Sequence, residues 1–398
     1  MFLQRRSERG QALVLIVFGM VALLGLTALS VDGGAAYTNR RQAQNTADAV
    51  ALDAALTKVR GGDWSATGFE RAASNGFDNN GTTNIVEIHN PPIDGLYVGD
   101  DEYIQVIITS YVDTYFGVIV GREQVTNRVQ AIARAKPSTQ EVVFPDNALV
   151  SLSPDNCGAV RVHGNASTTL LGGGLFVNSD CNKAFDQQGA NAYLYGPGLC
   201  VVGGSDLQQP GNVPAPMLCD PIPYPPEIVP PSPYCATDSV ENNGTFTPGN
   251  VSGTDLRGDV TLMTGLYCIT GDVMINGHDT WYGQNVVLYF VDGGLHINGP
   301  ATLQLDAPDD GPFKDLLIYV PMENDEDIII NGNSSSYFDG TILALASDIQ
   351  INGTQGSLSH GQIIGYTLDL IGDSNAVIRY DARENYVPTV PPKVELVK

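Results

Sequence analysis

Apolar residues first form one long uninterrupted run, Ala12–Ser30, and later recur in short runs separated by turn residues. The long run has 19 residues and no charge. An α-helix rises about 1.5 Å per residue, so the run would span about 28 Å, close to the hydrocarbon thickness of a bilayer. The pattern predicts a cytoplasmic tip and transmembrane helix over residues 1–31, with lipid contacting residues 12–30.

Basic residues give this helix a direction. Arg5, Arg6 and Arg9 precede the run. By the positive-inside rule they keep the N-terminus in the cytoplasm and export everything after residue 31, and Arg40–Arg41 beyond the run do not reverse this. We therefore expect a single-pass protein of the cell membrane with an extracytoplasmic body. A secretory signal cleaved near Ala28–Ser30 is the alternative.

Residues 32–62 are expected to form a helical stalk. The helix should resume after Gly33–Gly34, continue through Val59 and end at Gly61–Gly62, a pair suited to a helix C-terminus. Its apolar face consists mostly of small residues: Ala36, Ala43, Ala47, Val50, Ala51 and Ala54. Such a face suits either close packing with another helix or packing on the chain's own middle region.

The middle region, residues 63–136, has the pattern of a small α+β unit. A short helix is expected over residues 66–75, and strands over residues 84–89, 103–111 and 125–135. The acidic turn Asp100–Glu102 is expected to be a solvated turn and not a metal site.

Residues 137–387 have a different sequence pattern, in which short apolar runs end in the same turn signal. Ile-Asn-Gly recurs with its Asn at 276, 298, 331 and 352, at intervals of 22, 33 and 21 residues, and related turns follow Val162 and Ile371. These intervals approximate one coil of a β-solenoid, in which Ile points inward and Asn-Gly turns the corner. A loop near Asp306–Phe313 would fill the long interval. The fold class is therefore α+β with a mainly β body, and a β-sandwich is the alternative to the solenoid.

Two proline-rich stretches should lie outside the sheets. Residues 210–233 hold ten prolines among 24 positions, and proline removes a donor from a β-ladder. We expect an extended surface excursion between two parts of the solenoid. The tail, residues 388–398, is expected to be an extended terminus.

Charge is concentrated in the β-rich part. The net charge is −24; residues 1–136 hold 12 Lys and Arg against 14 Asp and Glu, and the remaining residues hold 8 against 30. Such an acidic body repels phosphates, so nucleic acid and anionic lipid are excluded as its partners. Solubility explains the acidity, and bound Ca²⁺ is the only cofactor that it suggests.

All six cysteines lie in the second half of the chain, at positions 157, 181, 200, 219, 235 and 268. An even number beyond a membrane anchor favours up to three disulfides, for which 15 pairings exist. We favour Cys219–Cys235, which would close the proline-rich segment. Free thiols are the alternative, and the spacing does not suggest zinc.

Acidic clusters suggest catalysis only weakly: Asp306, Asp309, Asp310, Glu323, Asp325, Glu326 and Asp327. Paired carboxylates serve glycosidases as acid and base, but an enzyme acting on acidic sugars also needs basic residues. Only Arg257 and Lys314 are near in sequence, and His278–Asp279 lies at a predicted corner. We expect no enzyme and assign no catalytic, cofactor-binding or metal residue.

The order of elements near the N-terminus carries a family resemblance. Arg9-Gly10-Gln11-Ala12 precedes the apolar run, Ser30-Val31-Asp32-Gly33-Gly34 and Tyr37 follow it, and Arg40–Asn45 and Thr46–Ala49 come next. Residues 8–60 thus resemble the TadE/TadG-like family, pilin-like proteins of the tight-adherence (Flp) pilus apparatus. The resemblance implies an envelope protein linked to pilus assembly. Prepilin peptidases cut after a glycine and favour glutamate five positions on, where this chain has Leu15 after Gly10.

The expected function is structural: a membrane-anchored extracytoplasmic protein of Tad/Flp pilus assembly or surface adhesion. Its expected partners are pilus-assembly or envelope proteins, with surface polysaccharide as a further candidate. One alternative is a carbohydrate-active solenoid enzyme, for which acidic residues should share a groove with a basic residue. The other is a minor pilin, which should lose residues 1–10 on maturation.

Overall fold

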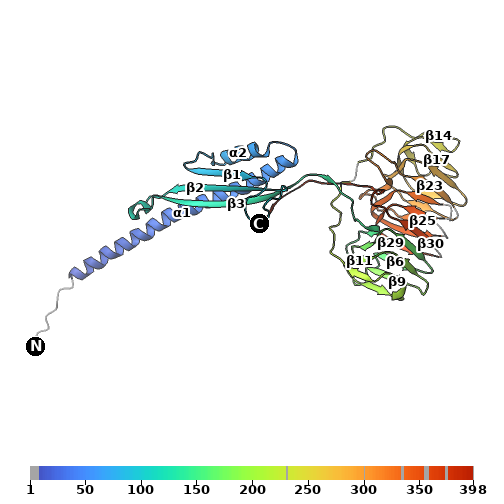
Figure 1. Ribbon diagram of the computed structural model, residues 1–398, viewed down its shortest axis with the longest axis horizontal. Coiled ribbons are helices and arrows are strands. Elements are labelled where there is room, and N and C mark those ends of the chain that lie inside the picture. The colour runs from blue at the N-terminus through green and yellow to red at the C-terminus, as the bar shows by residue number, and fades with distance from the viewer. Residues whose placement is uncertain are drawn as a thin grey trace, which may run out of the picture. The chain divides into compact units, whose positions relative to one another are not determined.

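The computed structural model describes residues 9–229, 232–299, 301–332, 336–353, 358–372 and 375–397. The chain is mostly β, with one long and one short α-helix among these residues (Figure 1). It divides into two compact units. The helix–sheet unit comprises Met1–Thr139 and Pro391–Lys398, and the β-body comprises Gln140–Val390.

Helix α1, Arg9–Val59, is continuous over 51 residues. The expected break at Gly33–Gly34 does not occur, because a glycine inside a helix costs only about 1 kcal/mol and leaves the backbone hydrogen bonds intact. The helix ends as predicted. Gly61 adopts a positive φ of 75°, and the amides of Gly61 and Gly62 donate to the carbonyls of Lys58 and Thr57.

The rest of the helix–sheet unit is a short helix and an antiparallel sheet. Helix α2, Trp64–Ser74, is capped by Asp63, whose Oδ1 accepts from the Ala66 amide at 3.0 Å. The sheet order is β1-β2-β3-β32, from the strands Asn84–His89, Tyr103–Asp113, Gln124–Lys136 and Lys393–Val397. A 3-10 turn, η1 (Gly117–Val120), lies between β2 and β3.

Strand β32 corrects the expectation for the C-terminal tail. Residues 393–397 are extended, but they pair antiparallel with β3, from Lys136↔Lys393 to Ile132↔Val397. Prolines 391 and 392 stop short of this strand, so its amides are free to join the ladder. Residues 393–397 therefore form the fourth strand of a sheet whose first strand is β1.

The small-residue face of α1 packs on the chain's own sheet. The fully buried residues of this face are Ala43, Ala47, Val50, Ala51, Ala54 and Ala55. They share one core with Ile104, Val106 and Ile108 of β2 and with alanines of β3. Of the two interpretations of the alanine pattern, packing within the chain is the one observed; Ala36 lies outside this core.

The β-body is built from three rows of parallel strands. Row 1 contains β13 (Pro216–Leu218), β11 (Leu199–Val201), β8 (Gly174–Val177), β5 (Asn147–Ser151), β29 (Ile363–Ile371), β27 (Thr341–Gly353), β24 (Leu316–Val320), β21 (Val286–Phe290), β18 (Gly265–Thr270) and β16 (Gly249–Ser252). Row 2 contains β12 (Ser205–Leu207), β9 (Phe185–Gln188), β6 (Val160–His163), the second halves of β29 and β27, β25 (Ile328–Gly332), β22 (Leu295–Ile297) and β19 (Val273–Ile275).

Row 3 completes the body. It contains β10 (Tyr193–Tyr195), β7 (Ser167–Leu171), β30 (Asn375–Arg379), β28 (Leu358–His360), β26 (Tyr337–Asp339), β23 (Thr302–Asp306), β20 (Thr280–Gly283), β17 (Val260–Leu262), β15 (Thr245–Phe246) and β14 (Glu241–Asn242). The pairing within these rows is parallel except between β14 and β15 at one end. From β5 to β12 and from β18 to β30 the chain visits rows 1, 2 and 3 in turn, and each such passage makes one winding.

The predicted corner repeat aligns in row 2. Ile275 pairs with Ile297, Ile297 with Ile330, and Ile330 with Ile351, all buried in one core. Asn298 Nδ2 donates to Asn276 Oδ1 at 3.2 Å, so neighbouring corners also contact each other. The long interval is filled as expected, because residues 307–315 connect β23 to β24 outside the rows.

The windings do not stack in chain order. The last winding, β29–β30, pairs with the first, β5–β6–β7: Ile363↔Leu149 in row 1, Leu370↔Val162 in row 2 and Val377↔Thr169 in row 3. We call this junction the seam. The chain thus starts in mid-stack at β5, winds to one end at β13, and resumes at the opposite end at β14. The connecting strands β4 (Thr139–Gln140) and β31 (Thr389–Val390) pair with each other.

The proline-rich segment connects the two ends of the stack. Ile222, Tyr224 and Ile228 pack on a core of row 1 side chains that includes Val150 and Leu343. Asn178 holds the segment, since its Nδ2 donates to the Ile222 carbonyl at 3.1 Å and its Oδ1 accepts from the Ile222 amide at 2.9 Å. The excursion predicted from the prolines is therefore packed against the body over this stretch.

Three disulfides are present: Cys157–Cys181, Cys200–Cys219 and Cys235–Cys268. The expected Cys219–Cys235 pair is wrong. Sequence proximity suggested a closed proline-rich loop, but the segment spans the stack, so each of its cysteines bonds to the winding at its own end.

Candidate functional site

The first half of α1 presents an apolar surface that no other part of the described chain covers. Its large side chains are exposed: Leu13, Val14, Leu15, Ile16, Val17, Phe18, Met20, Val21, Leu23, Leu24, Leu26, Leu29 and Val31. α1 is also the helix of this structure that is long and apolar enough to cross a membrane. An exposed apolar surface of this size marks an interaction site and not a solvated helix.

The two hydroxyls in this stretch are satisfied within the helix. Thr27 Oγ1 donates to the Leu23 carbonyl and Ser30 Oγ to the Leu26 carbonyl, each at 2.9 Å. Such i−4 bonds leave no hydroxyl donor that depends on water. The apolar half of α1 is therefore suited to a medium without water.

A carboxylate ends this apolar half and binds a distant loop. Asp32 Oδ1 accepts from the Tyr115 amide at 2.8 Å, and Asp32 Oδ2 accepts from the amides of Phe116 at 3.1 Å and Gly117 at 2.8 Å. These amides belong to the tip of the β2–β3 hairpin, which runs along α1 (Figure 1). We call this arrangement the Asp32 clamp.

The clamp stabilises the charged form of Asp32. Partial desolvation opposes ionisation, but the amides of Tyr115, Gly117 and Phe116 outweigh it and hold the pKa of Asp32 below its ordinary value. The side chain is therefore ionised at neutral pH and accepts bonds only.

Between the clamp and the alanine core, polar contacts join α1 to the hairpin. Asn39 Oδ1 accepts from Ser110 Oγ at 2.6 Å and from Asn127 Nδ2 at 3.0 Å. Asn127 Nδ2 also donates to the Ala36 carbonyl, and Gln44 Nε2 to the Gln130 carbonyl. These bonds hold the hairpin against the helix from Asp32 to Gln44.

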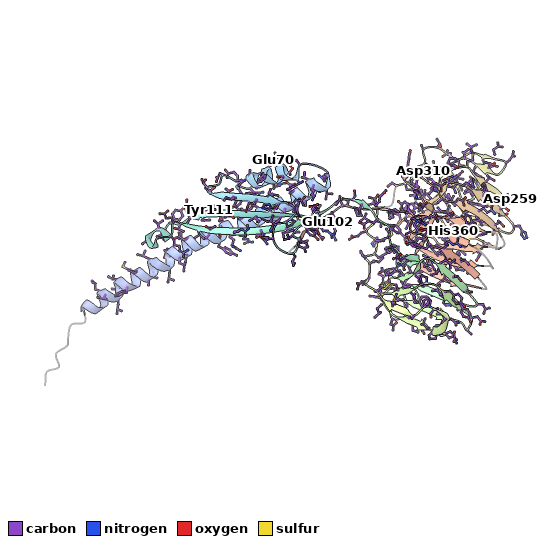
Figure 2. The ribbon with its side chains drawn as sticks, in the orientation of Figure 1. Glu70, Glu102, Tyr111, Asp259, Asp310 and His360 are labelled. Carbon is purple, nitrogen blue, oxygen red and sulfur yellow. A yellow bond between two sulfur atoms is a disulfide. The ribbon has the colours of Figure 1, made fainter. Side chains whose placement is uncertain are left out.

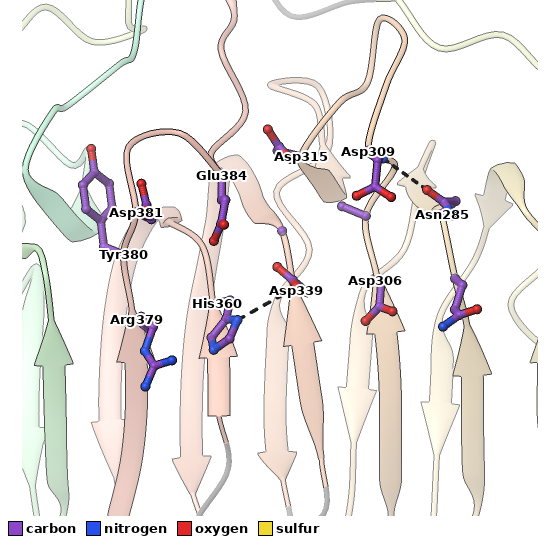
Figure 3. Close-up of a pocket in the computed structure, with 13 residues that line it drawn as sticks. Asn285, Asp306, Asp309, Asp315, Asp339, His360, Arg379, Tyr380, Asp381 and Glu384 are labelled. Atoms are coloured by element: carbon purple, nitrogen blue, oxygen red, sulfur yellow. Dashed lines mark hydrogen bonds and ion pairs between the residues drawn. The ribbon is translucent and has the colours of Figure 1, made fainter.

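The β-body carries a second candidate, an acidic groove of about 790 Å³ at one edge of row 3 (Figure 3). Asp306, Asp339, His360 and Arg379 occupy equivalent positions on four neighbouring strands, because they pair in register across β23, β26, β28 and β30. Loop residues Asp309, Asp315, Asp381 and Glu384 also line the groove. The imidazole Nδ1 of His360 lies 3.9 Å from Asp339 Oδ2.

Burial and the neighbouring negative charges both disfavour ionisation in this groove. Burial, followed by the charges of Asp339 and Asp309, raises the pKa of Asp306 above its ordinary value. Tyr337 donates to Asp339 Oδ2 at 2.6 Å, and burial together with this bond raises the pKa of Tyr337. Among the described residues, no group of three or more His, Cys, Asp or Glu side chains is arranged to hold a metal ion.

The structure separates most of the acidic residues singled out from the sequence. Asp306 and Asp309 share the groove, whereas Asp310 lines a neighbouring hollow with Phe313 and Glu323 lies beside the proline-rich segment. Burial, followed by the charge of Asp348, raises the pKa of Asp327. His296 acts on that pKa in the opposite direction. The enzyme hypothesis required acidic residues to share one groove with a basic residue. Of its seven acidic residues, Asp306 and Asp309 line the groove together with Arg379.

The basic residues and turns considered from the sequence do not themselves line the groove. Lys314 pairs with Asp315 at 3.0 Å, and Arg257 lines a hollow with Asp255. His278–Asp279 occupies the predicted corner, where Asp279 Oδ2 accepts from the Asn276 amide. In the helix–sheet unit, Glu102 Oε2 pairs with Arg134 Nη2 at 2.8 Å.

Comparison with known families decides what the first candidate resembles. Residues 10–57 match the family model described as "Putative Flp pilus-assembly TadE/G-like". The N-terminal segment is similar to this family. The TadE/G-like match lies wholly within α1, so it covers both the exposed apolar half and the half packed on the sheet. No curated protein and no solved structure matches the chain.

The sequence pattern did not indicate the Asp32 clamp or the groove. Asp32 was visible only as part of the TadE/G-like segment, and its partners are backbone amides, which any residue supplies. The uncharged stretch Thr114–Gly121 between two strands was the one available signal. The row from Asp306 to Arg379 has unequal spacing in sequence, so it appears only once the strands are paired.

Proposed function

We propose that this chain is a membrane-anchored extracytoplasmic structural protein associated with Tad/Flp pilus assembly or surface adhesion. The observation that carries the proposal is the coincidence of the TadE/G-like match, residues 10–57, with the one continuous helix α1. One half of that helix offers lipid an apolar surface, and the other half is part of a folded core. The pilus or envelope proteins of this system are its proposed partners.

The proposed orientation places the N-terminus in the cytoplasm. Arg5, Arg6 and Arg9 precede the apolar run, and the acidic β-body follows it. Three disulfides in the β-body support an oxidising compartment beyond the membrane.

We further propose that the β-body is a β-solenoid. Parallel pairing at intervals of about 20 residues and the stacked Ile column of row 2 support this fold over a β-sandwich, whose strands pair antiparallel. A rigid body with three long faces suits presentation at a surface, which is a structural role without catalysis.

A carbohydrate-active enzyme is the second candidate, favoured by the shared groove of Asp306 and Asp309 with Arg379. Six carboxylates line the groove with one guanidinium and one imidazole, and two of the carboxylates, Asp315 and Asp381, pair with Lys314 and Arg383. The lining keeps an excess of negative charge, which repels acidic sugars. The paired-carboxylate mechanism remains the hypothesis to test on neutral polysaccharides, where release of reducing ends by the wild-type chain but not by Asp306→Asn would establish it.

Membrane fractionation with protease shaving of intact cells tests the main proposal. We expect the full-length chain in the membrane fraction, released by detergent but not by salt, with protected fragments limited to residues near 1–31. Recovery of the β-body from the cytosol, or of a soluble full-length chain without detergent, would overturn it. Mass spectrometry of the native N-terminus separates the minor-pilin alternative, which requires cleavage after Gly10.

A further inference from the structure

The β2–β3 hairpin tip exposes apolar side chains that its own unit does not use. Residues 114–121 contain no charge. Tyr115 is 77% exposed, Val118 52% and Ile119 83%. These values match those of the lipid-facing candidates in the first half of α1, where Leu29 is 71% exposed.

The tip is an ordered structure and not a frayed loop. The Thr114 amide donates to the Glu123 carbonyl, the Arg122 amide to the Gly117 carbonyl and the Gly121 amide to the Val118 carbonyl, at 2.9 to 3.0 Å. Gly121 adopts a positive φ of 78° to close the 3-10 turn η1. Together with the Asp32 clamp, these bonds hold Val118 and Ile119 outward, where water contact costs free energy.

The clamp also sets the level of the tip along α1. Only Val31, itself apolar, separates Asp32 from the apolar run Ala12–Ser30. A helix over residues 12–31 rises about 30 Å, which is the hydrocarbon thickness of a bilayer, so Asp32 lies at the outer boundary when the run spans the membrane. The three amides bound to Asp32 place the tip at the same boundary.

We propose that the hairpin tip, Tyr115–Ile119, inserts into the outer interface of the membrane beside α1 and forms a second lipid anchor. The inference rests on the proposed membrane-spanning role of α1. Its occupant is lipid because the tip continues the apolar surface of α1 at the level where that surface leaves the hydrocarbon. Tyr at an interface keeps its hydroxyl in water while its ring contacts acyl chains, and Arg122 directly after the tip suits lipid phosphate.

A second anchor has a mechanical consequence for α1. A single helix can rotate and tilt in a bilayer, whereas a helix with an inserted hairpin beside it presents one fixed side to lipid. The hairpin is bonded to α1 from Asp32 to Gln44, so insertion of the tip orients the whole helix–sheet unit on the membrane.

Depth-dependent fluorescence quenching tests the inference on the full-length chain in nanodiscs. All six native cysteines are in disulfides, so one introduced cysteine is a unique labelling site. An environment-sensitive fluorophore on Ile119→Cys should lose emission when the lipids carry a spin label near the headgroup. The same fluorophore on Leu29→Cys reports α1. Leu96→Cys is the matched control, because Leu96 is 89% exposed and apolar but lies in the β1–β2 loop.

The two ends of β2 keep the probe and its control apart. Tyr111, near the tip, and Glu102, near the β1–β2 loop, lie at opposite ends of the sheet (Figure 2). We expect quenching at positions 29 and 119 and full emission at position 96. Quenching at 29 without quenching at 119, or equal quenching at 96 and 119, would overturn the second anchor while leaving the first. An unquenched probe at 29 would overturn the proposed membrane span itself.

Asp32 is a positioning residue in this scheme, and its variants supply a second readout. Asp32→Ala removes the acceptors of three amides and should reduce quenching at position 119 while quenching at position 29 is retained. Asp32→Asn keeps one carbonyl acceptor and should restore part of the loss. Unchanged quenching at 119 in Asp32→Ala would contradict the clamp's role in placing the tip.

Discussion

Arg161 and Asp369 face each other across the seam, with Arg161 Nη1 3.4 Å from Asp369 Oδ2, although 208 residues separate them in sequence. The ion pair is partly exposed, so it lies at the seam but contributes little to its stability. Beneath it, Leu370 pairs with Val162, and both are fully or almost fully buried. The junction between the last winding and the first is therefore a continuous part of the core.

This seam makes a first prediction about stability. Leu370→Ala should lower the free energy of unfolding of the β-body by about 2–5 kcal/mol, because it leaves a cavity in a closed core. Arg161→Ala should lower it by less than about 1 kcal/mol. Denaturant unfolding followed through buried Trp281, in a Trp64→Phe background, measures both. Equal effects of the two substitutions would contradict a seam held by its core.

Disulfides that fix the proline-rich segment supply a second prediction. Cys200–Cys219 and Cys235–Cys268 close loops of 19 and 33 residues. By the chain-entropy estimate, replacing either pair with alanines should cost about 3–4 kcal/mol, slightly more for the longer loop. Limited proteolysis should then cut within residues 219–235. Replacing Cys157 and Cys181 is the control, which should destabilise the body without exposing that segment.

A third prediction concerns pH. The pKa of Asp306 is raised by burial and by the nearby charges of Asp339 and Asp309, so the folded chain holds this proton more tightly than the unfolded chain. The charged form is thus penalised only in the folded state, and stability should fall as pH rises from about 3.9 through the raised folded pKa. Asp306→Asn should raise the Tm at neutral pH and leave it unchanged near pH 3.

Asp310→Asn is the matched control for that experiment. It removes the same charge from the same acidic body but lies in the loop beyond the row of Asp306. If Asp310→Asn raised the Tm as much as Asp306→Asn, the gain would come from lowering the net charge. It would not come from removing the buried charge of Asp306 beside Asp339 and Asp309.

The alanine face of α1 gives a fourth prediction. Ala47→Leu forces three extra carbon atoms into the closed contact between α1 and the sheet and should destabilise the helix–sheet unit by about 1–3 kcal/mol. Ala22→Leu, on the exposed apolar half of the same helix, should leave its folding unchanged. Thermal unfolding in detergent measures both variants. If Ala47→Leu left thermal unfolding unchanged, the contact between the alanine face of α1 and the sheet would not be tightly packed.

Local patterns in this chain predicted local structure well. The uninterrupted run, the Gly pair after Val59 and the Ile-Asn-Gly corners each depend on residues close in sequence, and α1 and the row 2 column follow from them. The seam depends instead on which winding lies beside which. The repeated turns predict stacked strands, but the similar turns after Val162 and Ile371 do not identify Val162 as the neighbour of Leu370.

The candidate sites were harder to predict from the sequence for the same reason, because they too join residues that are distant in sequence. The row from Asp306 to Arg379 is brought together by register across four strands, while loops of different length separate its members in sequence. The wrong disulfide had this origin too: nearness in sequence outweighed the distance that a proline-rich segment can travel. The Asp32 clamp joins residues 83 to 85 positions apart through backbone amides, which leave no compositional trace.

Entry and exit strands β4 and β31 pair with each other where the chain joins the β-body at mid-stack. The two ends of the stack, at β13 and β14, are therefore joined only to each other, through the proline-rich segment. Adding or removing a winding at the β13 end or the β14 end would require only that the proline-rich segment change length with it. Such changes in the number of windings would leave β4 and β31, through which the chain enters and leaves the β-body, unaltered.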